Sequence, residues 1–404
     1  MKINVNSEIG KLKSVLLHRP GKELENLTPD ILERLLFDDI PYLKEAQKEH
    51  DAFAQTLLDN DVEVLYIDNM VVEALDNHPE VKKTFVNQFV EESRVPSRSR
   101  KQAVYEFLMS LDHKTLVDKM IAGIRTCEVE IKNGLSIMDM LEDEYPFYTD
   151  PMPNILFQRD PFASIGNGLA INNMMTDARQ RETLLSEVMF KYHPRFEKEN
   201  IPQYISRHYR YKSEGGDMLV LNKETLAIGI SKRTDPRTIE HLARQIFDDN
   251  TTFKTILAFN IPKTRAFMHL DTVFTQVDYG TFTIHPGIMK ELTIFEIQKN
   301  GKKPLISKVV TTLEDILEKH LKRPIKLINI GGNDLITSGR EQWNDGANTL
   351  AIAPGVVIVY NRNHVTNEQL RKEGITVLEI PSSELSRGRG GPRCMSMPLD
   401  REDI

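Results

Sequence analysis

A repeated order of strand, turn, strand and helix constrains this chain more than any other feature of its sequence. Three segments share an apolar run, a turn, a second apolar run, an arginine and a helical stretch. They begin at Arg159, Glu214 and Gly331, and their arginines are Arg179, Arg233 and Arg362. In the third segment we expect the first strand within 331–336. Two further units are expected, over 268–292 and at the N-terminus with a helix near 41–59.

The repeat predicts about five units, each with two strands, a helix and a further strand. Repeats of this length are typical of arrays and propellers. A closed radial array leaves no free sheet edge, and it brings the start of each unit to a common axis. We therefore expect an α/β fold of this kind. An ordinary doubly wound sheet with chance similarities remains the alternative on periodicity alone.

A different pattern occupies the stretch between the first unit and the second. Amphipathic helices are indicated over 81–89, 102–111 and 115–125, glycine is rare, and strand patterns are absent. The proline-rich stretch 145–153 marks the end of this region. We expect an all-helical insertion at 70–149, within a catalytic α/β domain made of 1–69 and 150–404.

Composition limits the classes of function. The chain has 404 residues, with 52 lysines and arginines against 59 acidic residues, so its net charge is −7. No basic excess is available to neutralise nucleic acid phosphates. No apolar stretch is long enough to span a membrane, and the N-terminus lacks the apolar core of a signal peptide. With only two cysteines, far apart, we expect a cytoplasmic protein with reduced thiols.

Five side chains are candidates for chemistry. Cys394 lies in a glycine-rich loop flanked by arginines, where nearby cations favour the reactive thiolate; the alternative is a mobile tail with an incidental thiol. His269 and Asp271 would share one face of a strand, either as a proton shuttle or as a surface pair. Asp160 and Glu214 each precede an expected strand. They are either catalytic carboxylates or merely turn residues or helix caps. Cys127, in a helical stretch, is expected to be an apolar filler.

Other chemistries have little support in the sequence. Metal-binding HExxH helices, calcium loops, phosphate-binding glycine motifs and serine nucleophile elbows are all absent. Taken together, a thiol, an imidazole and three carboxylates would form a strongly acidic pocket. Its most economical partner is a planar cation with paired N–H donors, which is a guanidinium.

The chain closely resembles arginine deiminases, members of the guanidino-group-modifying or pentein superfamily. The resemblance extends along essentially the whole chain. The motifs that carry it are Leu36-Phe37-Asp38-Asp39, Phe157-Gln158-Arg159-Asp160, Glu214-Gly215-Gly216-Asp217, Met268-His269-Leu270-Asp271-Thr272-Val273-Phe274, Gly331-Gly332-Asn333, Glu341-Gln342-Trp343-Asn344-Asp345-Gly346 and Arg387-Gly388-Arg389-Gly390-Gly391.

This resemblance implies a five-bladed α/β propeller of ββαβ-type repeats with a helical insertion. It also implies that free L-arginine is hydrolysed to L-citrulline and ammonia without a cofactor or metal, in arginine catabolism, by a homo-oligomer. Cys394 looks like the nucleophile and His269 like the general acid and base. Asp160 and Asp271 look like the carboxylates that hold the guanidinium, and Glu214 like the one shared between substrate and His269. The residues that look like substrate contacts are Leu36, Asn154, Phe157, Arg179, Arg233, Gly388 and Arg389.

One departure from the family pattern precedes the nucleophile. Pro392-Arg393 stands where some members carry Gly-His, and an arginine cannot transfer a proton as histidine can.

Rival functions within the superfamily are amidino transfer to an amine and hydrolysis of methylated arginines. The arginines that look like α-carboxylate contacts, together with the full set of deiminase motifs, argue against both. A carboxylate clamp also argues against protein-bound arginine as substrate. The rival from another class is an arginine-binding protein without catalysis, which would release no ammonia.

Overall fold

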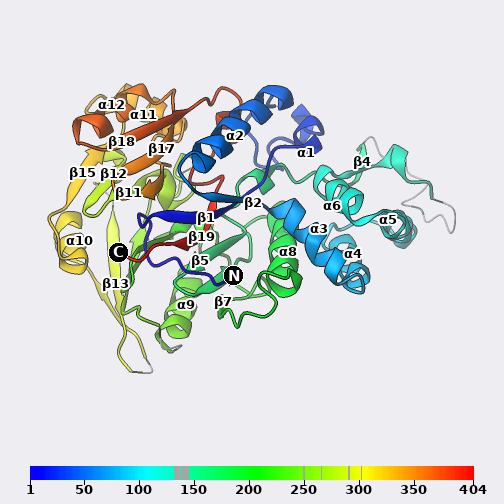
Figure 1. Cartoon of the computed structure of the whole chain (residues 1–404), viewed down its shortest axis with the longest axis horizontal. Coiled ribbons are helices and arrows are strands. Elements are labelled where there is room, and N and C mark those ends of the chain that lie inside the picture. Colours follow the sequence, from blue (N-terminus) through cyan, green and yellow to red (C-terminus); the bar gives the residue numbers. More distant parts are fainter. Residues whose placement is uncertain (132–136, 138–144, 249–250, 265, 290–291, 302) are drawn as a thin grey trace.

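The computed structural model has a mixed α/β fold whose chain ends meet in one sheet (Figure 1). It describes residues 1–131, 137, 145–248, 251–264, 266–289, 292–301 and 303–404. The C-terminal strand β19 (Met397–Arg401) pairs antiparallel with β1 (Leu12–Leu17), and β1 pairs parallel with β2 (Glu63–Tyr66). The C-terminus therefore completes the sheet that the N-terminus begins.

Four further sheets repeat this strand arrangement. In each, the central strand pairs antiparallel with the strand before it and parallel with a later strand. Their strands are β5 (Phe162–Ile165), β6 (Gly168–Ile171) and β7 (Gln203–Ile205); β8 (Met218–Asn222), β9 (Thr225–Ile230) and β10 (Thr255–Asn260); β11 (Phe274–Asp278), β12 (Thr281–Ile284) and β15 (Lys326–Asn329); and β16 (Leu350–Ala353), β17 (Val356–Tyr360) and β18 (Thr376–Ile380). A hairpin of β13 (Thr293–Gln298) and β14 (Leu305–Lys308) extends the β8–β10 sheet.

A helix lies within the crossover that joins each parallel pair, as parallel strands require a long connection. These helices are α2 (Leu43–Leu58), α8 (Asp177–Tyr192), α9 (Pro236–Asp248), α10 (Leu313–Leu321) and α12 (His364–Lys372). The expected order of two strands, a helix and a further strand is confirmed for the units that begin at 159 and 214. At the N-terminus, only β1 precedes the helix, and its antiparallel partner is β19 from the other end of the chain. In the unit that begins at 268, the helix α10 lies beyond residue 292, and β13 and β14 come before it.

The expectation for the third quoted segment is wrong in one respect. Residues 335–336 begin a helix, α11 (Leu335–Trp343), and the first strand of that unit is β16. The helix begins there because the Asp334 carboxylate accepts a hydrogen bond from the Thr337 N–H at 2.7 Å. Gly331 and Gly332 both adopt positive φ, which separates α11 from β15.

Four helices follow β2 and form a layer at one end of the molecule (Figure 1). They are α3 (Ile67–Asn77), α4 (Val81–Glu92), α5 (Arg98–Ser110) and α6 (His113–Ala122). Ser97 and Asp112 cap the last two by accepting hydrogen bonds from backbone N–H groups. Gly123, with φ of 83°, ends α6 where a Cβ atom would meet the Thr149 carbonyl oxygen at 2.8 Å.

The expected helices are confirmed, but the expected absence of strands is wrong. The segment β3 (Ile124–Arg125) pairs antiparallel with β4 (Phe147–Thr149), because the chain returns along itself at the end of this region. Buried side chains such as Val71 and Leu116 belong to the same apolar cluster as Leu184 of α8. The helices therefore share a core with the sheets. Residues 132–136 and 138–144 of the expected insertion lie outside the described residues.

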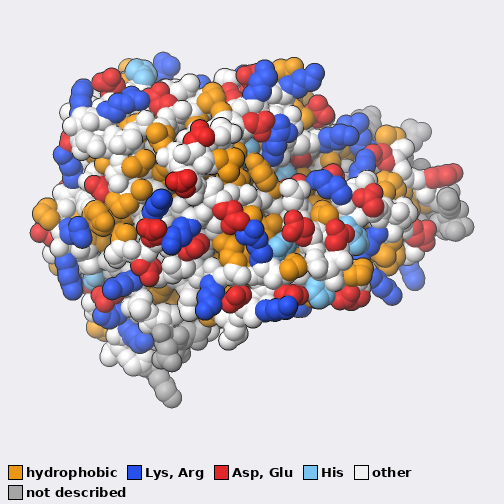
Figure 2. Space-filling view, viewed as in Figure 1, with side chains coloured by type: hydrophobic (Ala, Val, Ile, Leu, Met, Phe, Trp, Pro, Cys, Tyr) orange, Lys and Arg blue, Asp and Glu red, His pale blue; other side chains and the backbone are white. Residues whose placement is uncertain are grey.

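The surface has no single dominant charge on the side shown. Acidic and basic side chains are interspersed over the visible face in Figure 2. Among the described residues, we find no helix with the length and apolar character that crossing a membrane demands.

Candidate active site

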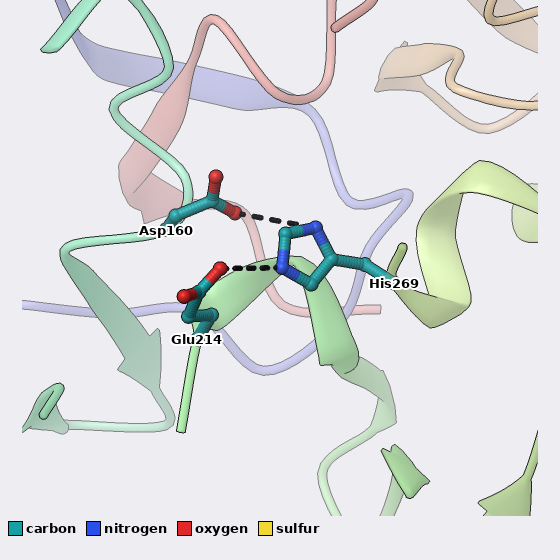
Figure 3. A group of neighbouring side chains, drawn as sticks. All are labelled: Asp160, Glu214 and His269. Atoms are coloured by element: carbon teal, nitrogen blue, oxygen red, sulfur yellow. Dashed lines mark hydrogen bonds and ion pairs between the residues drawn. The ribbon is translucent and has the colours of Figure 1, made fainter. Parts of the chain in front are cut away.

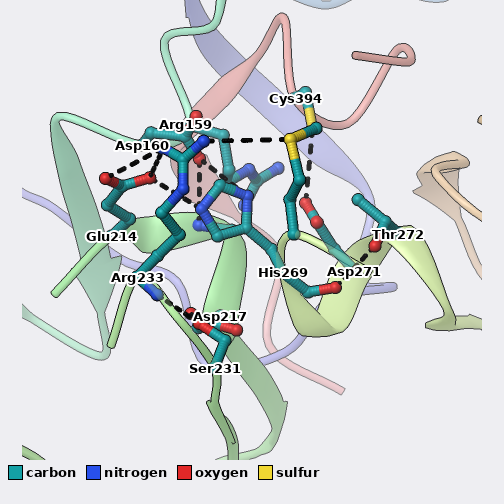
Figure 4. A network of polar contacts seen from close by, with 12 residues as sticks. Arg159, Asp160, Glu214, Asp217, Ser231, Arg233, His269, Asp271, Thr272 and Cys394 are labelled. Atoms are coloured by element: carbon teal, nitrogen blue, oxygen red, sulfur yellow. Dashed lines mark hydrogen bonds and ion pairs between the residues drawn. The ribbon is translucent and has the colours of Figure 1, made fainter. Parts of the chain in front are cut away.

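The site forms where four chain segments meet, each of which lies just before a strand. The Gly215 N–H donates to the Asp160 carbonyl at 3.1 Å, and the Arg159 N–H donates to the Cys394 carbonyl at 3.0 Å. The Asp217 carboxylate accepts a hydrogen bond from the Leu270 N–H at 2.9 Å. These bonds join chain segments that precede β5, β8, β11 and β19. The fold thereby brings distant stretches of sequence to one place (Figure 4).

His269 lies between two carboxylates (Figure 3). Its Nε2 is 2.7 Å from Glu214 Oε2, and its Nδ1 is 3.7 Å from Asp160 Oδ1. Burial disfavours the imidazolium, but Asp160 and Glu214 outweigh burial and raise the pKa of His269 to about 9. Burial also opposes ionisation of Glu214, yet Arg233 and His269 hold the pKa of that carboxyl below its usual range. At neutral pH the imidazole is therefore protonated and paired.

The Cys394 thiol is buried beside Asp271. Its Sγ lies 3.6 Å from Asp271 Oδ2, and its backbone N–H donates to Asn348 Oδ1 at 2.9 Å. Burial raises the pKa of Cys394 well above the usual value for a thiol, and the charges of Asp271 and Asp160 add to this effect. The resting sulfur is therefore a neutral thiol.

The Asp271 carboxylate has one oxygen that is hydrogen-bonded and one that is not. Its Oδ2 accepts a hydrogen bond from Arg393 Nη1 at 2.7 Å. Its Oδ1 is buried and has no hydrogen-bond partner among the described residues. The residue lies in the 3₁₀ helix η5 (Leu270–Thr272), so the expectation that His269 and Asp271 occupy one strand is wrong. The turn, and not a strand, brings both side chains to the site.

Three arginines surround the pocket, each beside an acidic residue. Arg179 donates to Asp160 Oδ2 at 2.7 Å, and Arg233 donates to Glu214 Oε2 at 3.0 Å. Arg389 Nη1 is 3.2 Å from Asp38 Oδ2. The buried Arg179 guanidinium also pairs with Glu182 at 2.9 Å. A ligand that binds these arginines must therefore compete with internal carboxylates.

The cavity between these groups is small. Its volume is about 20 Å³, which is room for about one water molecule, so side chains must move to admit a larger ligand. Ten of the twelve residues of the expected site line this cavity, and Glu214 and Asp271 do not. The lining residues are Leu36, Asn154, Phe157, Asp160, Arg179, Arg233, Met268, His269, Thr272, Gly388, Arg389 and Cys394.

One group could hold a metal ion by spacing alone. Asp160, Glu214 and His269 each present a ligand atom, and these atoms lie within 4.8 Å of one another. Both carboxylates already accept hydrogen bonds from arginines, and the raised pKa of His269 favours the protonated form that cannot ligate a metal. The donor set fits an organic cation with N–H groups better than a metal ion.

Two features of the site escaped the sequence reasoning. Arg393 pairs with Glu8 across 385 positions of sequence, with Nε 3.0 Å from Oε2. The Asn348 side chain accepts a hydrogen bond from the Cys394 backbone N–H and so orients that backbone. A lone glutamate near the N-terminus carries no local signal for such a role. Conversely, Cys127 is exposed in the turn η2 (Thr126–Glu128), so its expected role as a buried filler is wrong.

The fold and this cluster define a class of protein. Solved structures with the same fold include "SxtG an amidinotransferase from the Microseira wollei", with 15% identity and a TM-score of 0.54 over 100% of this chain and 98% of that one. DDAH from Pseudomonas aeruginosa, solved with citrulline, has 14% identity and a TM-score of 0.50 over 96% of this chain and 99% of its own. The chain thus has the mixed α/β fold of these structures, the pentein fold.

Sequence comparisons identify the family. A family model described as arginine deiminase matches residues 33–401. The arginine deiminase of Clostridium perfringens (strain SM101 / Type A) is 56% identical over 407 residues, which cover 100% of this chain and 98% of the relative. The arginine deiminase of Latilactobacillus sakei subsp. sakei (strain 23K) is 53% identical, over 100% of this chain and 98% of the relative. The chain belongs to the arginine deiminase family.

Proposed function

We propose that five side chains carry out the hydrolysis of free L-arginine to L-citrulline and ammonia, with Cys394 as the nucleophile. The conversion itself is the activity of the family to which this chain belongs. The observation that carries the assignment of roles is the 3.6 Å approach of the Cys394 sulfur to Asp271, beside an imidazole held by two carboxylates. This arrangement matches the positive charge and the paired N–H donors of a guanidinium.

Binding changes the local charge. The substrate guanidinium enters between Asp160 and Asp271. There it replaces Arg179 as the hydrogen-bond donor to the Asp160 carboxylate. Asp271 Oδ1, buried without a hydrogen-bond partner among the described residues, is the natural acceptor for one of its N–H groups. The new positive charge lowers the pKa of Cys394, whose proton leaves to solvent.

The chemistry then takes two stages. The Cys394 thiolate attacks the central guanidinium carbon and forms a C–S bond. His269 donates its proton to the departing amino group, the C–N bond breaks, and ammonia leaves a cationic thiouronium. Neutral His269 next takes a proton from water, and the resulting hydroxide attacks the same carbon. The C–S bond breaks with its electrons returning to sulfur, the hydroxyl proton is lost, and citrulline remains.

The amino-acid end of the substrate requires cations. Arg179, Arg233 and Arg389 line the cavity, and each can offer paired N–H donors to an α-carboxylate. Asn154 contributes a polar side chain to the same wall, while Leu36 and Phe157 contribute apolar contacts and Gly388 contributes backbone. This set favours the free amino acid over arginine within a protein chain.

The architecture supports a finer description. We propose that the five sheets with a common strand order are the blades of a closed five-bladed propeller formed by 1–69 and 150–404, with 70–149 as a helical insertion. Support comes from β19, since the C-terminal strand completes the first sheet. By its family resemblance we also place the protein in cytoplasmic arginine catabolism, as a homo-oligomer that needs no cofactor.

Product analysis tests the proposed reaction. Incubation with arginine is expected to release citrulline and ammonia in equal amounts. Amidino transfer to an added amine would instead yield ornithine without ammonia, and a hydrolase of methylated arginines would release methylamines from those substrates faster than ammonia from arginine. Arginine binding without ammonia release would leave only a binding protein. Any of these results would overturn the proposal.

The raised pKa of Cys394 predicts a dependence of thiol reactivity on charge. In a Cys127→Ser background, which removes the exposed thiol, 2-chloroacetamide is expected to alkylate Cys394 slowly at pH 7. The rate should rise only as pH exceeds the free thiol pKa of about 8.5. Cationic 2-chloroacetamidine should react at least about tenfold faster than this neutral isostere at pH 7. Mass spectrometry of the modified chain measures both rates, and equal rates or a thiol pKa below 8.5 would contradict the prediction.

A further inference from the structure

Trp343 stacks on one of the arginines that line the active-site cavity. The Arg389 guanidinium carbon lies 3.4 Å from the centre of the Trp343 ring, a cation–π arrangement at close contact. Arg389 is buried and lines the cavity, whereas 44% of Trp343 is exposed. The indole therefore covers the outer face of a guanidinium whose side chain reaches the pocket.

The two residues before Trp343 anchor the backbone that carries the indole. The Glu341 carboxylate accepts hydrogen bonds from the N–H groups of Val365 and Thr366 at 2.9 and 2.8 Å, at the start of α12. The Gln342 side chain donates to the Ala266 carbonyl at 2.5 Å. These bonds fix the end of α11, and Trp343 is the next residue. The motif Glu341-Gln342-Trp343 thus anchors the end of α11 and directs the Trp343 ring toward Arg389.

The loop that carries Arg389 needs such support. Arg389 has φ of 61°, a left-handed conformation that costs energy in any residue with a side chain. The preceding residue, Gly388, lies so close to Phe37 and Phe157 that a Cβ atom would meet each ring at 2.9 Å. Asp38 holds the guanidinium edge at 3.2 Å. Trp343 and Asp38 therefore restrict the Arg389 guanidinium, while Phe37 and Phe157 confine the backbone just before it.

We propose that Trp343 is a positioning residue that determines affinity for the amino-acid end of the substrate by stacking against Arg389. Because a guanidinium stacked on an indole keeps its edge available, Trp343 orients Arg389 without competing for its N–H donors. The inference rests on the proposed function of Arg389 as a ligand of the α-carboxylate. It assigns a role to a residue that does not itself reach the reacting atoms.

Kinetics of a double-mutant cycle tests this role. Trp343→Leu is expected to raise KM for arginine about tenfold, equivalent to about 1.4 kcal/mol, and to change kcat less than twofold. Arg389→Ala should raise KM further. In the Arg389→Ala background, Trp343→Leu should then have almost no additional effect, because the indole acts only through the guanidinium. Trp343→Phe, which retains a smaller aromatic face, should fall between the native protein and Trp343→Leu.

The outcomes separate the inference from the proposed function. If Arg389→Ala leaves KM unchanged, the proposed role of Arg389 fails. If Arg389→Ala raises KM but Trp343→Leu does not, the role of Trp343 is wrong. An effect of Trp343→Leu that persists without Arg389, or that falls on kcat, would mean a merely structural role and would also overturn the inference.

A spectroscopic measurement keeps the inference testable if Trp343→Leu fails to fold. Trp343 is the only tryptophan of the chain, so intrinsic emission reports on this ring alone. In a Cys394→Ala variant, which prevents turnover, added arginine should change the emission as Arg389 engages the carboxylate. The same titration of a Cys394→Ala and Arg389→Ala double variant should give little change at saturating arginine. An unchanged emission in the first variant, or equal changes in both, would overturn the inference.

Discussion

Replacing Cys394 with alanine is expected to reduce kcat for citrulline formation by at least about 10⁴-fold. The sulfur forms the covalent bond to the guanidinium carbon in the proposed reaction, and a methyl group cannot replace it. His269 cannot supply an equivalent nucleophile, because its imidazole is protonated and paired with Glu214 and Asp160. Citrulline and ammonia assays over several hours measure the residual rate.

Binding and folding should survive this substitution. Calorimetric titration should show that the Cys394→Ala variant still binds arginine, because the carboxylates and arginines of the cavity are unchanged. Cys127→Ala is the matched control: this thiol is exposed and distant from the proposed chemistry, so its loss should leave kcat within about twofold. Appreciable citrulline formation by Cys394→Ala would remove the covalent mechanism.

Replacing Arg393 with methionine is expected to lower the free energy of unfolding by about 3–5 kcal/mol. Arg393 is completely buried and pairs with Asp271 at 2.7 Å and with Glu8 at 3.0 Å. Methionine would fill similar volume but would remove the cation that pairs with both buried carboxylates. Urea unfolding followed by circular dichroism measures the difference, provided that both proteins unfold in one transition.

The pH dependence of this deficit follows from Glu8. Burial opposes its ionisation, but Arg393 and Arg159 outweigh burial and lower the pKa of Glu8 to about 2. The stabilisation from this lowered pKa is present above the usual carboxyl value of 4.5 and is lost as pH falls through about 2. Without Arg393 the buried Glu8 should bind a proton at higher pH, so the deficit of the variant should shrink as pH is lowered from 7 to 4.

Two further variants isolate the cause. Arg371→Met breaks an ion pair with Glu379 whose side chains are 46% and 34% exposed, and it should cost less than about 1 kcal/mol. Glu8→Gln combined with Arg393→Met should be less destabilised than the sum of the two single changes, because one uncompensated charge is gone. A loss for Arg393→Met no greater than for Arg371→Met would show that the buried network contributes little.

Much of the fold was predictable because it follows from local pattern. Apolar runs that alternate with turns, as at 162–171 and 218–230, produce the paired strands wherever each unit has a face to bury. The helices of 67–122 follow from their amphipathic spacing and from caps such as Ser97. One error arose where capping overrides apolar character: the Asp334 carboxylate begins a helix at Leu335 and Ile336, which were expected to belong to a strand.

The sequence by itself determined the chemical inventory of the site. A thiol in a glycine-rich loop, one histidine and acidic residues at the starts of strands are sufficient to indicate a guanidinium ligand, since residue type decides charge and nucleophilicity. Only the tertiary structure decided which groups meet: Glu8 with Arg393, Trp343 with Arg389, and His269 between Asp160 and Glu214. The physical reason is that ion pairs and stacks act over a few ångströms, whereas the residues that form them are up to 385 positions apart and are joined only when the sheets pack together.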